Sequence, residues 1–227
     1  MTEEDFYHYT SENGAAAILY SGKVRPSLSS SSRDASYGDG VYLTTLEPRL
    51  GRNTIAKNNW DGVARKQDHK MEFYFKITLP SSRVKRAKDM RDIQVYPGTL
   101  RLAEYKWDLR NWDGDLQATQ HFMVSSEGRA ARKLGSVMGR YTLCWNKIIN
   151  STPVYQHDDG AFYLYLDTHG NWKVTDVVMK GNYYLKQHSN NSPCPQKMIP
   201  WEYYDYDNTY DIMIDNTLKV YPVYPSY

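Results

Sequence analysis

The sequence has few cysteines and no long apolar run, and both absences narrow the class of protein. Cys144 and Cys194 are the two cysteines among 227 residues, too few to define a disulfide scaffold. We expect two buried thiols, with one bridge between them as the alternative. No stretch approaches the roughly 20 apolar residues of a membrane-spanning helix, so we expect no membrane partner.

A large excess of charge of one sign is also missing. The chain has 28 Lys and Arg residues against 26 Asp and Glu residues, whereas a dedicated nucleic-acid-binding protein has a strongly basic face. With 41% hydrophobic and 24% charged residues, the composition is that of a folded soluble protein. The acidic start, MTEEDF, is unlike a secretory signal. We expect a monomer, either cytoplasmic or released or delivered without a recognisable signal peptide.

Several catalytic motifs are absent. The sequence contains no Walker loop, no GxSxG elbow, no paired CxxC and no HExxH, which argues against the enzyme classes that these motifs mark. The histidines lack the spacing of metal ligands, so we expect no metal site; they are His8, His69, His121, His157, His169 and His188.

Residues 1–138 have the pattern of an α+β domain. Period-2 alternation predicts strands in FYHYT, GVYLTT, EFYFKITL, DIQVY and TLRLAEYKW. SENGAAAILYSG predicts a short helix with Ser11 as its N-cap and Gly22 as its C-terminal stop. The domain would end near RAARKLGSVMG, which predicts a helix that stops at Gly135 or Gly139.

Residues 139–227 change to alternating aromatics punctuated by Gly, Asn, Asp and Pro, and they contain 13 of the 21 tyrosines. AFYLYL, the turn DTHGN and WKVTDVV predict a β-hairpin. We interpret this part as a small β-rich accessory module. Its aromatics would form a core and cross-strand pairs; the alternative is an exposed platform for a glycan or another ligand. The residues concerned are Tyr155, Tyr163, Tyr165, Trp172, Tyr183, Tyr184, Trp201, Tyr203 and Tyr204.

Three motifs of the first domain resemble a known family. They are FYHYT with His8, YGDGVYLT with Tyr42 and RDIQVY with Asp92. Over about residues 5–105 they resemble the H-Y-D group of ADP-ribosyltransferase-like toxin domains, which are related to diphtheria toxin and the poly(ADP-ribose) polymerases. The resemblance implies an ADP-ribosyltransferase-like split β-sheet core with short helices. It also implies NAD as the substrate and His8, Tyr42 and Asp92 as the catalytic residues.

The resemblance gives each of the three a role. His8 would hydrogen-bond the 2′-hydroxyl of the nicotinamide ribose and orient the glycosidic bond. Tyr42 would stack on the cationic nicotinamide ring. Asp92 would stabilise the oxocarbenium-like ribose and polarise the nucleophile, with Glu104 as the substitute if the strand register differs. The ordinary alternatives are a structural histidine and a strand-edge aspartate.

Further residues are implied to bind NAD. The backbone N–H and C=O of Tyr9 would meet the carboxamide, and Thr10 would contact the ribose. Related enzymes supply a second stacking residue from a helix in the region of RNTIAKNNW. This segment has no tyrosine, so Trp60 or Ile55 would take that place.

The loops of the first domain supply the remaining candidates. Tyr37, Gly38 and Gly40 would border the cofactor, because glycine permits positive φ and close approach of a ligand; a plain turn explains the glycines equally well. Arg25 or Arg33 would contact the NAD pyrophosphate.

A run of cations precedes Asp92. In the superfamily that the sequence resembles, this loop faces the macromolecular substrate. It would therefore favour an anionic acceptor, a nucleic acid or an acidic protein surface; the alternatives are a solvated connection and a short-lived contact with the NAD pyrophosphate. The cations are Arg83, Lys85, Arg86, Lys88 and Arg91.

The resemblance implies a mono-ADP-ribosyltransferase that cleaves the nicotinamide glycosidic bond and transfers ADP-ribose to a protein or nucleic acid. Aspartate is one methylene shorter than the glutamate of the polymerases, which argues against polymer synthesis. Two alternatives are open: an NAD glycohydrolase, in which water is the nucleophile, and a catalytically silent glycan- or nucleic-acid-binding protein on the same fold.

Overall fold

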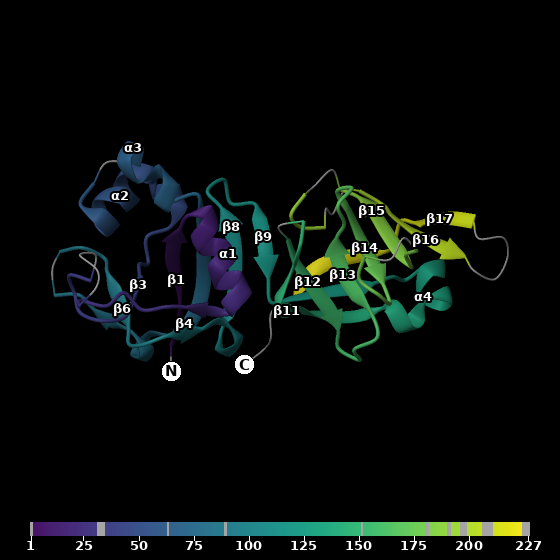
Figure 1. Ribbon diagram of the computed structural model, residues 1–227, viewed down its shortest axis with the longest axis horizontal. Helices are drawn as coiled ribbons and strands as arrows, with labels where there is room; N and C mark the ends of the chain where they lie inside the picture. The colour runs from purple at the N-terminus through teal and green to yellow at the C-terminus, as the bar shows by residue number, and fades with distance from the viewer. Residues whose placement is uncertain are drawn as a thin grey trace. The chain divides into compact units, whose positions relative to one another are not determined.

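The computed structural model divides into two units, Met1–Gln117 and Ala118–Tyr227 (Figure 1). Helices and strands mix in the first unit, and strands dominate the second, as expected for an α+β chain with a β-rich C-terminal part. The structure describes residues 2–30, 35–62, 64–88, 90–150 (only the backbone at 146), 152–179, 182–189, 192–195, 199–205 and 211–223.

The first unit is built around an antiparallel sheet in the order β1-β4-β8-β9. β1 pairs along its whole length with β4, and this register puts His8 opposite Phe75. The strands are β1 (Glu3–Thr10), β4 (Phe73–Pro80), β8 (Lys106–Asn111) and β9 (Leu116–Thr119).

Side chains alternate along β1, so that its two faces have different surroundings. Tyr7 and Tyr9 point to one face, where they join a buried cluster with Ile55, Met71 and Tyr74. His8, between them in the sequence, therefore points to the opposite face.

Smaller sheets flank this core, one in the order β3-β6-β5 and one formed by β2 and β7. Tyr7 joins β1 to the segment after β3, because its N–H donates to Thr44 O at 2.8 Å and its C=O accepts from Thr44 N at 3.1 Å. This bridge brings Tyr42 close to β1. The strands are β2 (Lys23–Val24), β3 (Val41–Leu43), β5 (Lys85–Arg86), β6 (Gln94–Tyr96) and β7 (Leu100–Arg101).

Helix α1 (Glu12–Ser21) begins and ends where the sequence predicts. Ser11 Oγ accepts from Gly14 N at 3.1 Å, and Gly22 adopts a positive φ of 67° and donates to Ile18 O. Both predicted caps are confirmed.

The other helical segments of the first unit are short. One of them, η4, interrupts TLRLAEYKW, so the continuous strand predicted there is wrong: β7 and β8 are separate strands. The segments are α2 (Arg52–Trp60), α3 (Ala64–Gln67), η1 (Pro48–Leu50), η2 (Asp68–Lys70), η3 (Ser81–Arg83) and η4 (Leu102–Glu104).

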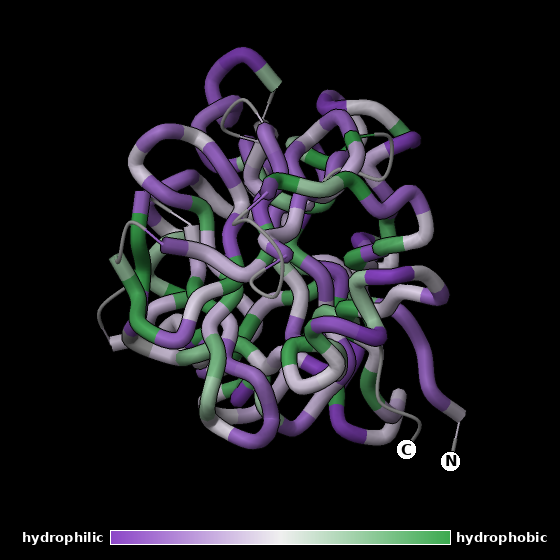
Figure 2. The backbone as a smooth tube through the Cα atoms, turned by 90° about the vertical axis from the view of Figure 1, so that its right-hand side faces the viewer, coloured by the Kyte–Doolittle hydropathy of each residue, from purple (hydrophilic) through white to green (hydrophobic). Residues whose placement is uncertain are grey.

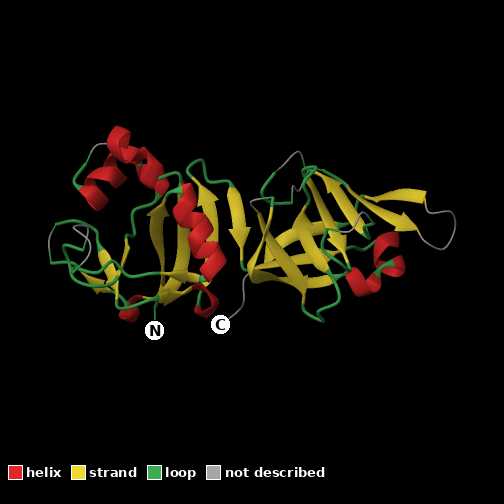
Figure 3. Ribbon diagram, in the orientation of Figure 1, coloured by secondary structure: helices red, strands yellow, loops and turns green. Residues whose placement is uncertain are grey.

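In the described ranges of the second unit, nine strands form one curled antiparallel sheet (Figure 3) in the order β17-β16-β15-β14-β13-β12-β11-β10-β18. Hydrophobic and hydrophilic residues are interspersed along the backbone (Figure 2), and buried and half-buried positions alternate along β16, as expected where one face of a sheet is buried. The strands are β10 (His121–Ser125), β11 (Gly139–Ile149), β12 (Thr152–His157), β13 (Tyr163–Leu166), β14 (Asn171–Thr175), β15 (Leu185–His188), β16 (Trp201–Asp205), β17 (Asp211–Asp215) and β18 (Lys219–Val223).

The aromatic residues of the second unit build its core. The predicted hairpin is confirmed by pairing of β13 with β14, in which Leu164 lies opposite Val174. Three of the nine aromatics singled out in the sequence, Tyr163, Tyr184 and Tyr204, are half-buried. The other six are buried: Tyr155, Tyr165, Trp172, Tyr183, Trp201 and Tyr203. A ligand for this unit stays a prediction.

A buried carboxylate fastens the end of β17 to the segment that follows β10. Asp215 accepts hydrogen bonds from Ala130 N at 2.9 Å, from Ser126 Oγ at 2.9 Å and from Thr217 Oγ1 at 2.6 Å. Burial by itself raises the pKa of Asp215, but these hydrogen bonds outweigh it and lower the pKa to about 2.

The boundary between the units lies earlier than the sequence indicates. We expected it after residue 138, whereas the contacts divide the chain after Gln117. The reason is β10, which pairs with β11 and β18 of the second sheet. The helix expected over 129–139 is α4 (Arg129–Lys133) followed by η5 (Gly135–Val137), inside the second unit.

Two expectations about chain chemistry can be compared with the structure. No helix in the described part of the chain has both the length and the hydropathy to cross a membrane. Cys144 is half-buried, Cys194 is buried, and both are free thiols. The alternative of a bridge between them is therefore wrong.

Candidate active site

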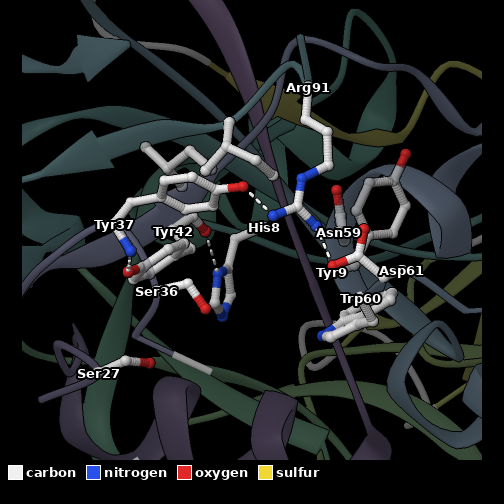
Figure 4. Close-up of a pocket in the computed structure, with 12 residues that line it drawn as sticks. His8, Tyr9, Ser27, Ser36, Tyr37, Tyr42, Asn59, Trp60, Asp61 and Arg91 are labelled. Carbon is white, nitrogen blue, oxygen red and sulfur yellow. Dashed lines mark hydrogen bonds and ion pairs between the residues drawn. The ribbon is translucent and has the colours of Figure 1, made fainter. Parts of the chain in front are cut away.

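A pocket of about 250 Å³ lies in the first unit, where β1, β3, the end of α2 and the segment before β6 meet (Figure 4). Several of the residues predicted to contact NAD line this pocket: His8, Tyr9, Tyr37, Tyr42 and Trp60. Other residues in its lining had been given no such role: Ser27, Ser36, Leu43, Asn59, Asp61 and Ile93. Arg91 also lines the pocket, although the sequence had assigned it to the basic run.

His8 projects from β1 toward the backbone of β3. Its Nδ1 lies 3.1 Å from the carbonyl oxygen of Tyr42. A carbonyl oxygen can only accept, so Nδ1 carries the proton and Nε2 is left as an acceptor. Desolvation by burial lowers the pKa of His8 below its ordinary value of 6.5, more than this hydrogen bond raises it. The imidazole is therefore neutral at pH 7, in the tautomer that can accept from a hydroxyl at Nε2.

Tyr42 is locked in place through its hydroxyl group. The hydroxyl donates to Gly38 O at 2.9 Å and accepts from Tyr37 N at 2.8 Å. The rings of Tyr37 and Tyr42 lie 6.1 Å apart at 46°. Burial raises the pKa of Tyr42, so the phenol is neutral. Two aromatic rings of fixed orientation thus form one side of the pocket.

Trp60 is the last residue of α2 and offers an aromatic face from another segment. Lys70 Nζ lies 5.5 Å from its ring centroid, in a cation–π contact. Ile55, the other candidate for the second stacking residue, is 0% exposed in the core cluster. Because Ile55 is buried and Trp60 lines the pocket, the structure favours Trp60 of the two, and its stacking role stays a prediction.

The ring of Tyr9 is committed to the core, because its hydroxyl donates to Leu46 O at 2.8 Å. Its backbone is directed differently. Residues two apart in a strand turn their N–H and C=O groups toward the same edge, and Tyr7 uses that edge to pair with Thr44. The N–H and C=O of Tyr9 therefore face the edge at which β1 borders the pocket.

Asp92 does not line the pocket, contrary to the prediction that its carboxylate faces the same cleft as His8 and Tyr42. Its Oδ2 instead accepts from Thr45 N at 2.8 Å and from Thr45 Oγ1 at 2.5 Å. Thr44 Oγ1 also donates to Oδ2, at 3.1 Å. The carboxylate is thus held by the turn after β3.

Asp92 is nevertheless ionised, and its neighbours in the sequence, Arg91 and Ile93, line the pocket. Burial favours a raised pKa, but hydrogen bonds from Thr45, Gln94 and Thr44 outweigh it and lower the pKa of Asp92 below its ordinary value. The backbone of Asp92 is paired with Asn58 of α2 in both directions, at 2.8 and 2.9 Å. Asp92 therefore ties together β3, α2 and the start of β6, which carry the walls of the pocket.

Arg91 and Asp61 are the charged residues that the structure adds to the site. Arg91 Nη1 lies 2.6 Å from Asp61 Oδ2, and its Nη2 donates to the hydroxyl of Tyr37. Asp61 follows α2 with a positive φ of 52°. No catalytic pattern contains it, and only the packing of α2 against the segment before β6 reveals its position.

Other predicted residues lie outside the lining of the pocket. Thr10, Arg25 and Glu104 are absent from it; Arg25 and Glu104 are exposed, and Glu104 lies 4.0 Å from Arg101. Arg33 lies outside the described residues. These positions do not support the ligand contacts expected of Thr10 and Arg25.

The two glycines before Tyr42 serve the backbone. Gly38 has a positive φ of 95°, which glycine adopts without strain. A Cβ at Gly40 would lie 2.6 Å from Tyr96 O, so Gly40 permits close approach of β6. Neither glycine lines the pocket. The structure therefore fits the alternative of a plain turn, with close strand packing at Gly40, better than contact with the cofactor.

No group of three or more His, Cys, Asp or Glu side chains is arranged to hold a metal ion in the part of the chain that the structure describes. The pocket instead offers a neutral imidazole, aromatic faces, a backbone donor–acceptor pair and a guanidinium group. This set suits a ligand with a flat ring, hydroxyl groups and negative charge.

Comparison with protein families identifies the segment that forms this site. Residues 6–103 match a family model described as a HYD1 signature containing ADP-ribosyltransferase. This part of the chain is therefore similar to that ADP-ribosyltransferase family. Searches of the curated proteins and of the solved structures found no match.

The matched segment covers less than half of the chain and lies within the first unit. It contains His8, Tyr42 and Asp92 and every residue that lines the pocket. The predicted resemblance to ADP-ribosyltransferase toxin domains is confirmed, and the match supports ADP-ribosyltransferase activity in general. The second unit lies outside the match.

Proposed function

We propose that the protein is an NAD-dependent mono-ADP-ribosyltransferase that transfers ADP-ribose to a macromolecule. The observation that carries the proposal is the meeting of His8, Tyr42 and Trp60 in a single pocket inside the ADP-ribosyltransferase segment. Enzymes of this class take ADP-ribose from NAD. The proposal includes the split sheet of ADP-ribosyltransferase-like folds. Its two halves would be the sheet that contains β1 and the sheet that contains β3.

The nicotinamide riboside end of NAD would occupy the pocket. Tyr42 and Trp60 offer ring faces to the cationic nicotinamide, and the backbone of Tyr9 offers a donor and an acceptor to the carboxamide. His8 Nε2 would accept from the ribose 2′-hydroxyl. A volume of about 250 Å³ lies below the roughly 300–1,000 Å³ of pockets for drug-sized ligands, so the rest of the dinucleotide would extend beyond it.

The reaction breaks the bond between the nicotinamide nitrogen and the ribose carbon. The electron pair leaves with nicotinamide, which becomes neutral, while positive charge develops on the ribose. A nucleophile then bonds to that carbon and loses its proton to a base. Fixed orientation of the ribose by His8 and of the ring by Tyr42 lowers the entropic part of this barrier.

Two carboxylates are candidates to stabilise the developing charge, and only Asp61 lines the pocket in this structure. Asp61 lines the pocket but is paired with Arg91. Asp92 is kept ionised, and both of its chain neighbours, Arg91 and Ile93, line the pocket. We assign the role to Asp92, whose carboxylate would have to leave Thr44 and Thr45 and turn toward the pocket when NAD binds.

A second groove suits an anionic acceptor. It shares Ser36 and Tyr37 with the NAD pocket, so a molecule bound in it would lie next to the reacting ribose. Its cations come from the basic run before Asp92: Lys85, Arg86 and Lys88. The positive charge favours a nucleic acid or an acidic protein surface.

The test is incubation with NAD labelled in the adenine ring, with and without protein, DNA and RNA acceptors. Label transferred to a macromolecule together with nicotinamide release supports the transferase, and label found only in free ADP-ribose indicates the glycohydrolase. No nicotinamide release from any mixture would identify a silent binding protein.

Variants of the two carboxylates separate their roles in the same assay. We expect Asp92→Asn to abolish most nicotinamide release and Asp61→Asn to retain it. The opposite pattern would transfer the stabilising role to Asp61. Unfolding by urea should accompany each assay, because Asp92→Asn also weakens the hydrogen bonds to Thr44 and Thr45.

A further inference from the structure

Arg91 differs from the other cations of its run in where its side chain lies. Its guanidinium lines the NAD pocket, and its side chain is 23% exposed. The remaining four cations are exposed and are absent from that lining: Arg83, Lys85, Arg86 and Lys88. The run therefore divides into one cation that faces the pocket and others that do not.

Two segments hold Arg91 across the site (Figure 4). Tyr37, in the loop before β3, accepts a hydrogen bond from Nη2 and lies under the guanidinium, with 5.1 Å between its ring centroid and Cζ. Asp61, at the end of α2, is 2.6 Å from Nη1. His8 lines the same pocket, so the cation lies within reach of a ligand that also contacts His8.

The partner of Arg91 on the α2 side is a weak one. The side chain of Asp61 is 75% exposed, and ion pairs with an exposed carboxylate contribute little because water and salt screen them. A guanidinium presents a planar fork of N–H groups that matches phosphate oxygens as well as carboxylate oxygens. A phosphate in the pocket would therefore exchange for Asp61 at small cost.

We propose that Arg91 binds the diphosphate of NAD, and that Asp61 occupies the phosphate position when no dinucleotide is bound. This inference rests on the proposed function, because it takes the pocket to hold the nicotinamide riboside of NAD. The diphosphate follows that ribose along the molecule. Tyr37 keeps the guanidinium in place through its ring and hydroxyl while the anion changes.

The two charged residues then affect binding in opposite directions. Removal of the Arg91 charge deletes a contact that only phosphate-bearing ligands use. Removal of the Asp61 charge deletes the anion that competes with phosphate. A purely structural ion pair between Arg91 and Asp61 would instead make both substitutions harmful, and equally harmful for ligands with and without phosphate.

The experiment is calorimetric titration with two ligands that cannot be cleaved: carbocyclic NAD and the matching carbocyclic nicotinamide riboside, which lacks phosphate. The proteins are the wild type, Arg91→Gln, Asp61→Asn and, as the matched control, Arg83→Gln from the same cationic run. For carbocyclic NAD we expect affinity to fall about tenfold or more in Arg91→Gln, to rise in Asp61→Asn and to be unchanged in Arg83→Gln. For the riboside we expect equal affinity in all four.

Three results would overturn the inference. Equal affinity of the wild type and Arg91→Gln for carbocyclic NAD would show that Arg91 does not contact the diphosphate. An equal loss for both ligands in Arg91→Gln makes Arg91 a residue that shapes the pocket. Failure of the wild type to bind either ligand refutes the proposed function itself, whereas the first two results leave that function standing.

Discussion

Trp60 in the first unit and Trp172 in the second use the same side chain in different ways. Trp60 is half-buried at the end of α2 and lines the pocket. Trp172 is 0% exposed, donates its indole N–H to Ser192 O at 2.9 Å and packs 6.4 Å from the rings of Phe122 and Tyr155. The dense aromatic sequence of the second unit thus mainly forms a core, whereas Tyr37, Tyr42 and Trp60, which line the pocket of the first unit, are half-buried.

The sharpest test of this contrast is Trp172→Ala against Trp60→Ala. Loss of a fully buried tryptophan leaves a cavity, so Trp172→Ala should lower the free energy of unfolding by about 3–5 kcal/mol. Trp60→Ala should cost far less stability and should weaken binding of carbocyclic NAD. Urea unfolding and calorimetric titration measure the two effects. An equal loss of stability in both variants would show that Trp60 contributes to the core as much as Trp172 does, and would contradict the contrast.

The next largest effect concerns His8. His8→Ala should reduce nicotinamide release at least about 100-fold, as expected when one positioned hydrogen-bonding group is removed from a transition state. His169→Ala, at a histidine whose side chain is 83% exposed in the second unit, is the matched control and should be active. Equal activity of the two variants would contradict the assignment of His8.

The acid limb of the pH profile tests the same residue. Protonation of His8 places a proton on Nε2 and removes the acceptor. Because the pKa of His8 is lowered from 6.5, nicotinamide release by the wild type should be constant near pH 7 and should decline only on the acid side of pH 6.5. A decline that begins above pH 7 would show that a different group is titrating.

A smaller effect is expected at Asp215, one of the buried carboxylates of the second unit. Asp215→Asn should lower the free energy of unfolding by about 1–3 kcal/mol at pH 7, because it weakens hydrogen bonds to a buried charge. The folded-state pKa of about 2 lies below the ordinary value of 3.8, so the stabilisation is present above pH 3.8 and is lost as the pH falls toward 2. Urea unfolding at pH 7 and at pH 3 should therefore show a smaller difference between the two proteins at pH 3. A difference independent of pH would contradict this account.

The smallest effect is expected from Tyr42→Phe. This change keeps the ring and removes the hydroxyl that joins Tyr37 N to Gly38 O. Gly38 is exposed and Tyr37 is half-buried, so water can replace at least the bond to Gly38 O, and kcat/KM for NAD should fall by only about threefold. Tyr42→Ala, which removes the ring, should be much more damaging. Equal losses in both would assign the function of Tyr42 to its hydroxyl.

Local features of the fold could be predicted from the sequence because their causes are local. The caps at Ser11 and Gly22 and the hairpin of β13 and β14 depend on residues a few positions apart. His8 and Tyr42 could be paired through the resemblance to a known family. The division of the chain after Gln117 could not be predicted from the sequence, because it depends on which distant strands pair with β10.

The direction of the Asp92 carboxylate also could not be predicted from the sequence, because it depends on residues far away in the chain. It is decided by hydrogen bonds from Thr44 and Thr45, which are 48 and 47 residues away in the chain. Asp61 was missed because its place in the pocket follows from the docking of α2. Arg91 was grouped with its neighbours by charge, although only the structure separates it from them.

The pairing of β18 with β10 has a consequence for how the second unit is made. His121 lies opposite Val223, so one edge of β10 has no partner until the ribosome has released almost all of this unit. Pairing over such a separation is slow, and an open strand edge readily recruits another chain. We therefore expect this edge of β10 to be the part of the second unit most open to pairing with another chain during synthesis.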